Sequence, residues 1–158
     1  MRVFCSAFLV SLGLSGAAAA CPNFDLKAAE AYRADGQQLY TPRSFTVMAG
    51  GDNYIWNCSN VKPGTDTGAG YFPSAPDFSF DLSGMDRYTL DVSVVSNCDA
   101  ALLINTASAS WFYDDDDNGN LDPKISLTRP INGRIDVWVG TYDGDLCDAE
   151  LQLETFDR

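Results

Sequence analysis

Apolar and polar residues alternate along most of the chain beyond residue 40, and this period of two is typical of strands that bury one face. Turn pairs such as Gly50-Gly51, Asn118-Gly119 and Asp143-Gly144 separate the alternating runs. Strands are predicted at residues 44–49, 52–57, 77–82, 87–95, 101–105, 111–113, 125–128, 134–141 and 149–156. Short strands at this spacing favour an all-β, jelly-roll-like antiparallel β-sandwich of about eight to nine strands.

One stretch before these strands has a different pattern. Asp25 can cap a helix, residues 26–33 are mostly good helix formers, and Gly36 can end the helix. We therefore predict a short helix within an N-terminal arm at residues 21–38. The β-sandwich domain is predicted to follow at residues 39–158.

The first twenty residues have the layout of a secretory signal peptide. A positive start at Met1-Arg2 precedes a short apolar run, and Ala18-x-Ala20 forms a cleavage box. The apolar run is too short to cross a bilayer, which takes about 20 apolar residues, so no membrane span is expected. We predict that residues 1–20 are removed and that the mature chain, secreted or periplasmic, begins at Cys21.

A cysteine directly after the cleavage site can instead carry a bacterial lipid anchor at Cys21. Such signals usually have Leu three residues before the cysteine, whereas this chain has Ala18. The plain secretory signal is therefore favoured over the lipoprotein anchor.

Cleavage leaves four cysteines, an even number that in an exported chain indicates two disulfides. Four cysteines allow three pairings, and the sequence leaves all three open. We favour Cys21–Cys58, which would fasten the N-terminal arm, and Cys98–Cys147, which would join the end of one strand to the start of the last.

Composition excludes several functions. The chain has 158 residues, a formal net charge of −12 and no histidine. The excess of acid repels phosphate backbones, so no nucleic-acid partner is expected. Without histidine there is no Ser-His-Asp triad, no Cys-His dyad and no imidazole metal ligand.

The densest polar feature is the segment 114–122, which reads Asp-Asp-Asp-Asp-Asn-Gly-Asn-Leu-Asp. It matches the oxygen-ligand spacing of a calcium loop that starts at its first aspartate. The predicted ligands are Asp114, Asp116, Asn118, Asn120 and Asp122. The twelfth position is Ile125 rather than glutamate and no helix is predicted on either side, so the pattern is no EF-hand. A calcium-binding hairpin loop and a solvated acidic turn both remain open.

Two other patterns could carry chemistry. Asp66-Thr67-Gly68-Ala69 matches the short motif of aspartic proteases, but it follows a Pro-Gly loop and has no second copy. A surface loop is favoured there, and a small hydrolase using a carboxylate pair from Asp66 or the acidic hairpin is the alternative function. Three tryptophans, Trp56, Trp111 and Trp138, could line a carbohydrate platform, although core packing is more usual at strand spacing.

Most of the mature chain, and most strongly the segment 88–142, resembles the bacterial pre-peptidase C-terminal domain family. The resemblance rests on Asp99-x-x-Leu-Leu-x-Asn105, on the aspartate run 114–117 and on Gly133-x-x-Asp136-Val-Trp138-Val-Gly-Thr141. It implies a β-sandwich module of secreted bacterial proteins that is non-catalytic and sometimes binds calcium, here through Asp114, Asp116 and Asp122 with help from Asn118. We therefore expect a monomeric, exported accessory module that binds a protein or polysaccharide ligand.

Overall fold

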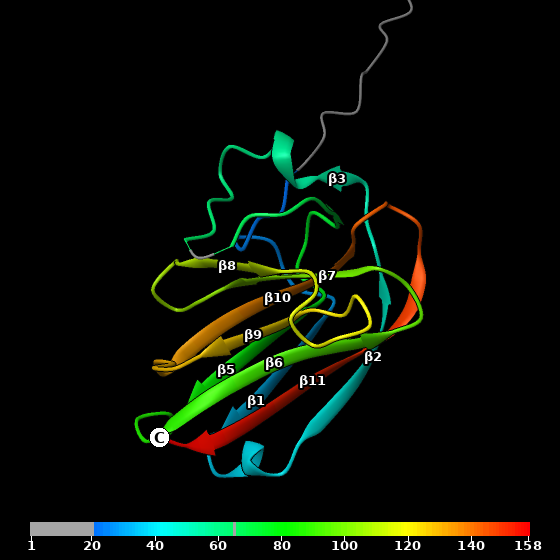
Figure 1. Ribbon diagram of the computed structural model, residues 1–158. Helices are drawn as coiled ribbons and strands as arrows, with labels where there is room; N and C mark the ends of the chain where they lie inside the picture. Colours follow the sequence, from blue (N-terminus) through cyan, green and yellow to red (C-terminus); the bar gives the residue numbers. More distant parts are fainter. Residues whose placement is uncertain (1–20, 65) are drawn as a thin grey trace, which may run out of the picture.

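A computed structural model describes residues 21–64 and 66–158 (Figure 1). The predicted signal peptide at residues 1–20 lies outside the described residues. None of the described helices is long and apolar enough to cross a membrane.

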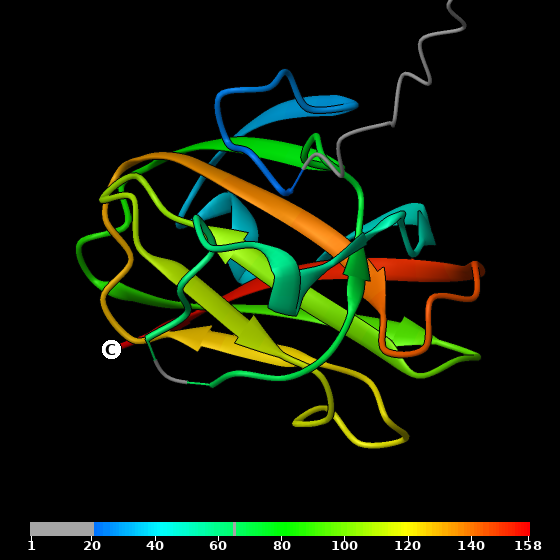
Figure 2. The same ribbon diagram turned by 90° about the horizontal axis from the view of Figure 1, so that it is seen from above.

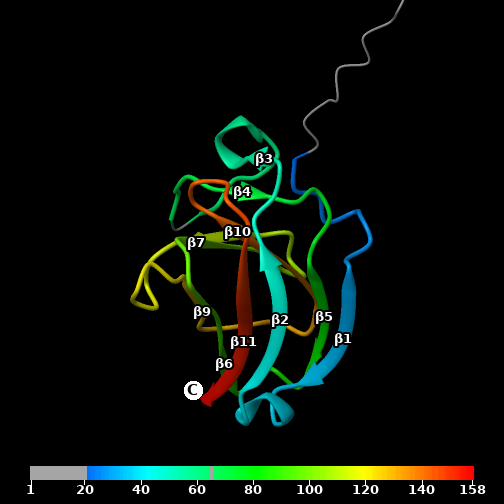
Figure 3. The same ribbon diagram turned by 90° about the vertical axis from the view of Figure 1, so that its right-hand side faces the viewer.

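Two sheets pack face to face and confirm the all-β sandwich (Figures 1 and 3). The four-stranded sheet has the order β2 (Arg43–Ala49), β11 (Cys147–Asp157), β6 (Tyr88–Ser96) and β9 (Lys124–Leu127). The seven-stranded sheet contains β1 (Glu30–Asp35), β5 (Phe78–Ser83), β10 (Gly133–Thr141), β7 (Ala100–Asn105), β8 (Trp111–Asp114), β4 (Tyr71–Phe72) and β3 (Asn53–Tyr54). Short 3₁₀ turns, η1 (Gln38–Tyr40) and η2 (Ile55–Asn57), lie between strands.

The predicted helix in the N-terminal arm is wrong. Residues Glu30–Asp35 form β1, which pairs in parallel with β5 and is the one parallel neighbour among the described strands. Tyr32 and Ala34 alternate into the core, where Tyr32 contacts Phe45 with ring centroids 4.7 Å apart. A single short helix is marginal in water, and strand pairing plus aromatic burial outweighs local helix propensity here.

The seven-stranded sheet is covered on both faces. Its inner face meets the other sheet through residues such as Phe80, Leu102 and Val137. On its outer face a second cluster forms around Trp138 and Trp111, whose ring centroids lie 5.2 Å apart, and Phe24 of the N-terminal segment packs against it. Burial on both sides explains why β7 is a continuous apolar run rather than an alternating one.

Two disulfides hold the covering segments in place. Cys21 is bonded to Cys58 and Cys98 to Cys147, which is the pairing that we favoured from the sequence. The first bond fastens the start of the described chain to the segment after η2. The second joins the corner between β6 and β7 to the first residue of β11.

Candidate functional site: the acidic loop and its neighbours

The acidic loop, residues 114–122, leaves β8 at a buried carboxylate. Asp114 is only 4% exposed, and its Oδ2 accepts hydrogen bonds from the backbone N–H groups of Asp117 at 3.1 Å and Lys124 at 2.7 Å. These bonds tie the start of the loop to the start of β9. Figure 2 shows the loop, in yellow, projecting from one side of the sandwich.

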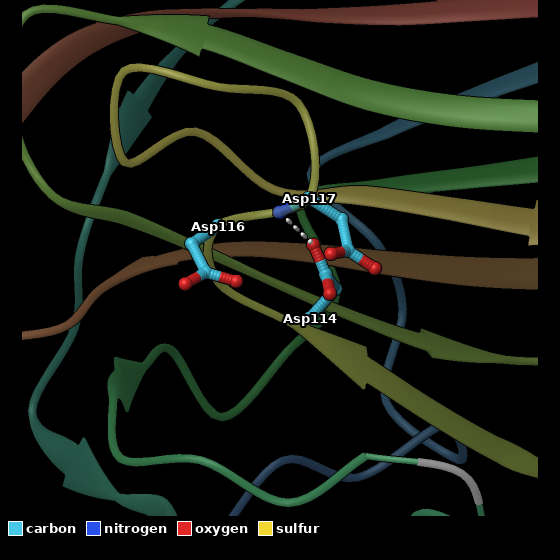
Figure 4. A group of neighbouring side chains, drawn as sticks. All are labelled: Asp114, Asp116 and Asp117. Atoms are coloured by element: carbon cyan, nitrogen blue, oxygen red, sulfur yellow. Dashed lines mark hydrogen bonds between the residues drawn. The ribbon is translucent and has the colours of Figure 1, made fainter.

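Three carboxylates gather at the base of this loop. Asp114, Asp116 and Asp117 each offer an oxygen, and these oxygens all lie within 4.8 Å of one another (Figure 4). Asp116 and Asp117 are exposed. Asp117 was absent from the ligand set predicted by sequence spacing, because that spacing assigns alternate positions and skips it.

The remaining predicted ligands occupy other positions on the loop. The Asn118 side-chain amide donates to the Val94 carbonyl at 2.9 Å, and a carboxylate oxygen of the buried Asp122 accepts the Ser96 hydroxyl at 2.7 Å. Both side chains thereby anchor the loop to β6. Asn120 is exposed at the loop tip, where its φ of 55° lies in the left-handed region.

Burial and mutual repulsion disfavour the charged forms of these acids. Burial raises the pKa of Asp114, the charges of Asp117 and Asp115 add to the rise, and the two backbone N–H donors oppose it. The pKa of Asp99, next to the second disulfide, is raised by burial and then by Asp143 and Asp116. A bound cation would relieve this repulsion.

Two hollows share Tyr113, the residue before Asp114. One, of about 390 Å³, is lined by Asp66, Asp114, Asp117 and Lys124 among others. The other, of about 280 Å³, is mainly apolar, and Trp56 lies on its wall. The structure thus brings Asp66 to the same hollow as two aspartates of the acidic loop, although about fifty residues separate them in the chain.

The loop that carries Asp66 rests on Tyr113. The Tyr113 hydroxyl donates to the Ala69 carbonyl, and a side chain at Gly68 would collide with the Tyr113 ring, because its Cβ would lie 2.4 Å from ring atoms. Gly68 is therefore needed for close approach rather than for catalysis. The protease-like motif at residues 66–69 is therefore part of a surface loop that contacts a buried tyrosine.

The three tryptophans have different surroundings. Trp111 and Trp138 are buried in the outer cluster and cannot offer a binding platform. Trp56 is 61% exposed in η2, beside the apolar hollow. Of the predicted aromatic platform, only Trp56 is available to a ligand.

Comparison with solved structures finds distant likenesses, among them the two described here. No family model matches the chain, and no curated protein does. The pre-peptidase C-terminal domain of a Bacillus anthracis collagenase is 15% identical, with a TM-score of 0.46 over 82% of this chain and 99% of that one. PliG of Aeromonas hydrophila, a periplasmic inhibitor of g-type lysozyme, is 10% identical, with a TM-score of 0.44 over 81% and 100%.

The first likeness is to a domain of the family that the sequence motifs resemble. Both matches are distant in sequence and in geometry.

Proposed function

We propose that the mature chain is an exported, non-catalytic binding module whose acidic loop holds a structural calcium ion. The observation that carries the proposal is the convergence of the Asp114, Asp116 and Asp117 oxygens within 4.8 Å at the base of an anchored loop. Three like charges at this spacing repel one another unless a cation lies among them. Calcium prefers six to eight oxygens, and the loop offers carboxylate, amide and backbone oxygens.

The three clustered aspartates would bind the ion directly, and Asn120 and backbone carbonyls of the loop could complete its shell. Asn118 and Asp122 would position the loop against β6. A bound ion would also order the wall that the loop shares with Tyr113, and so the surface next to the Trp56 hollow. We propose that this surface contacts the partner, a protein or polysaccharide.

An exported location is supported by the two disulfides together with the signal-like first twenty residues. Disulfides persist in oxidising compartments and are rare in the cytosol. The net charge of the chain after residue 20 is −13, because 9 basic and 22 acidic residues remain.

Calcium titration tests the proposal. Calorimetry on the mature protein should detect one calcium ion per chain with an affinity in the range of about 10⁻⁴ to 10⁻³ M, as for extracellular sites. At ten to a hundred times this concentration, calcium should stabilise the fold by about 1.4–2.7 kcal/mol. Asp116→Asn, at an exposed position, should weaken binding by roughly tenfold or more because one carboxylate ligand is lost.

Asp157→Asn is the matched control, because it removes one exposed acid at the opposite end of β6 and β11 from the loop anchors. It should leave calcium binding unchanged. An absence of both binding heat and thermal stabilisation at 10 mM calcium would reject the calcium site, as would equal effects of the two variants.

A small hydrolase is the alternative function, and one observation favours it. Asp66 lines the same hollow as Asp114 and Asp117, so a carboxylate pair is available there. Turnover of a peptide or glycoside substrate that disappears in both Asp66→Asn and Asp114→Asn would support this function. Turnover retained in both variants would exclude it.

A further inference from the structure

A polar row crosses the outer face of the seven-stranded sheet, away from the acidic loop. Ser79 on β5 lies opposite Asp136 on β10, Asp136 lies opposite Asn105 on β7, and Asn105 lies opposite Trp111 on β8. On one side the row borders Leu103 and Trp138 of the outer cluster, whereas on β5 and β10 its other neighbours on this face include the charged Asp81 and Arg134. Polar side chains buried in such a face cost free energy unless each finds a hydrogen-bond partner.

Asp136 has its partners, whereas Asn105 does not. Asp136 is 2% exposed, and its carboxylate accepts the Ser79 hydroxyl and a two-pronged contact from the Arg134 guanidinium at 2.8 Å. Asn105 is 3% exposed, and its amide nitrogen has no hydrogen-bond partner. An unpaired buried amide destabilises a fold, so its presence calls for an explanation.

Asn105 lies in the wall of a hollow of about 320 Å³. The hollow opens between the N-terminal residues Phe24 and Asp25 and the turn that follows β7. In that turn Ala109 has a φ of 56°, and the hydroxyls of Thr106 and Ser108 lie 3.0 Å apart. A left-handed alanine is a strained conformation, and such strain is often found at binding sites.

The N-terminal side of the hollow is held firmly. Arg134 donates to the Phe24 carbonyl while it is fixed by Asp136, and the Phe24 ring lies 6.0 Å from that of Trp111. The disulfide at Cys21 fastens the same segment. The walls are thus set by an ion pair, an aromatic contact and a covalent bond, which is the kind of rigid support that a binding site needs.

We propose that this hollow binds one ring of a neutral saccharide. Its walls combine donors from Asn105 and Arg134, the Asp25 carboxylate as an acceptor, and apolar surface from Phe24 and Ala109. A pyranose ring matches this mixture, because its hydroxyls both donate and accept while its C–H face is apolar. Two carboxylates, Asp25 and Asp136, outnumber the single guanidinium, so the hollow disfavours anionic sugars.

The binding mode centres on the Asn105 amide. The amide nitrogen is closed to solvent in the free protein. A half-turn about the terminal side-chain bond exchanges its nitrogen and oxygen, and a bound ring would favour the rotamer in which the nitrogen faces the hollow. Hydroxyls of a bound ring would satisfy the amide that is unpaired in the free protein. The site is separate from the acidic loop, and the proposal does not depend on calcium.

The test follows the Asn105 side-chain amide signals by nuclear magnetic resonance in the mature protein. Cellobiose, maltose and N,N′-diacetylchitobiose are the probes, sorbitol is the acyclic control and galacturonic acid the anionic control. At least one disaccharide should shift the Asn105 and Ala109 signals saturably, with a dissociation constant on the order of 1 mM because one ring buries little surface. The two controls should leave these signals in place.

Asn105→Leu separates a binding role from a structural one. It keeps a similar shape and removes the unpaired amide, so it should weaken saccharide binding by about tenfold or more while raising the melting temperature by roughly 3–6 °C. Asn53→Leu is the matched control. The Asn53 amide donates to the Phe72 carbonyl at 2.9 Å and to the Ser74 hydroxyl at 3.1 Å, so this variant should lose stability and keep the saccharide affinity.

Three results would overturn the proposal. They are the absence of a saturable shift with all three disaccharides, an equal response to sorbitol, and an unchanged affinity in Asn105→Leu. Arg134→Lys is an independent test, because the Arg134 side chain is exposed and lysine keeps the positive charge but lacks the planar guanidinium group. It should also weaken binding.

Discussion

Replacing Asp77 by asparagine is expected to stabilise the protein at pH 7 by about 2–4 kcal/mol. Burial raises the pKa of Asp77 from 3.8 to about 7, and the one backbone N–H that its carboxylate accepts, from Val139 at 2.8 Å, opposes this rise only in part. A shift of this size corresponds to about 4 kcal/mol, and partial solvent contact of the side chain reduces it. Asparagine keeps an acceptor for Val139 without the buried charge.

The sign of the pH dependence follows from proton binding. The folded state holds the Asp77 proton more tightly than the unfolded state does, so this group's contribution is fully present below about pH 4. It is lost as the pH rises from about 4 to 7. Denaturant unfolding should therefore show that the free energy of unfolding of the wild type falls between pH 4 and 8. This fall should be smaller in Asp77→Asn.

The effect of Asp136→Asn on stability is the comparison for that of Asp77→Asn. Asp136 is also buried, but it is paired with Arg134 and Ser79, so asparagine there should destabilise the fold. A loss of stability in Asp77→Asn at pH 7, or a pH profile parallel to that of the wild type, would contradict the predicted role of burial.

Removing the Cys98–Cys147 disulfide with a pair of alanines is expected to cost about 4 kcal/mol. The bond joins residues 49 apart in sequence, and releasing a loop of this length increases the entropy of the unfolded chain. It also frees the corner where the Asp99 carbonyl accepts the Tyr142 N–H at 2.8 Å. Urea unfolding of the oxidised wild type and of the double variant measures the difference.

Cys21→Ala with Cys58→Ala is the second arm of this experiment. Its sequence separation of 37 predicts a similar entropic cost, and it also frees the segment that supports the saccharide hollow. Reduced wild-type protein should lose the sum of the two effects. A loss below about 1 kcal/mol for the Cys98–Cys147 variant would show that the loop stays ordered without its bond.

The local pattern of apolar and polar residues predicted most strands correctly and the first element, β1, wrongly. Alternation placed β5, β6, β10 and β11 because the two-residue period reports directly which side of a strand is buried. The segment before them was predicted to be a helix because its signals, a capping Asp25, good helix formers and a terminating Gly36, are all local. Its partner β5 lies about fifty residues further on, and this pairing is invisible in the segment itself.

In the candidate site, too, some residues were predicted from the sequence and others are brought together only by the fold. Spacing pointed to the acidic loop and to Asp114 and Asp116, but not to Asp117, which joins them through the turn at the base of the loop. The meeting of Asp66 with this loop, and the unpaired amide of Asn105, had no sequence signal. An asparagine at the end of an apolar run looks the same whether its amide faces solvent or is buried without a partner.

The sequence by itself indicated the fold class, predicted an export signal and fixed the density of acid at 114–122, because these patterns depend on neighbours along the chain. Tertiary structure decided that β1 is a strand, that the tryptophans other than Trp56 are buried, and that carboxylates from separate loops share one hollow. The physical reason is that burial, and with it the free-energy cost of each polar group, depends on segments that meet only when the sheets pack.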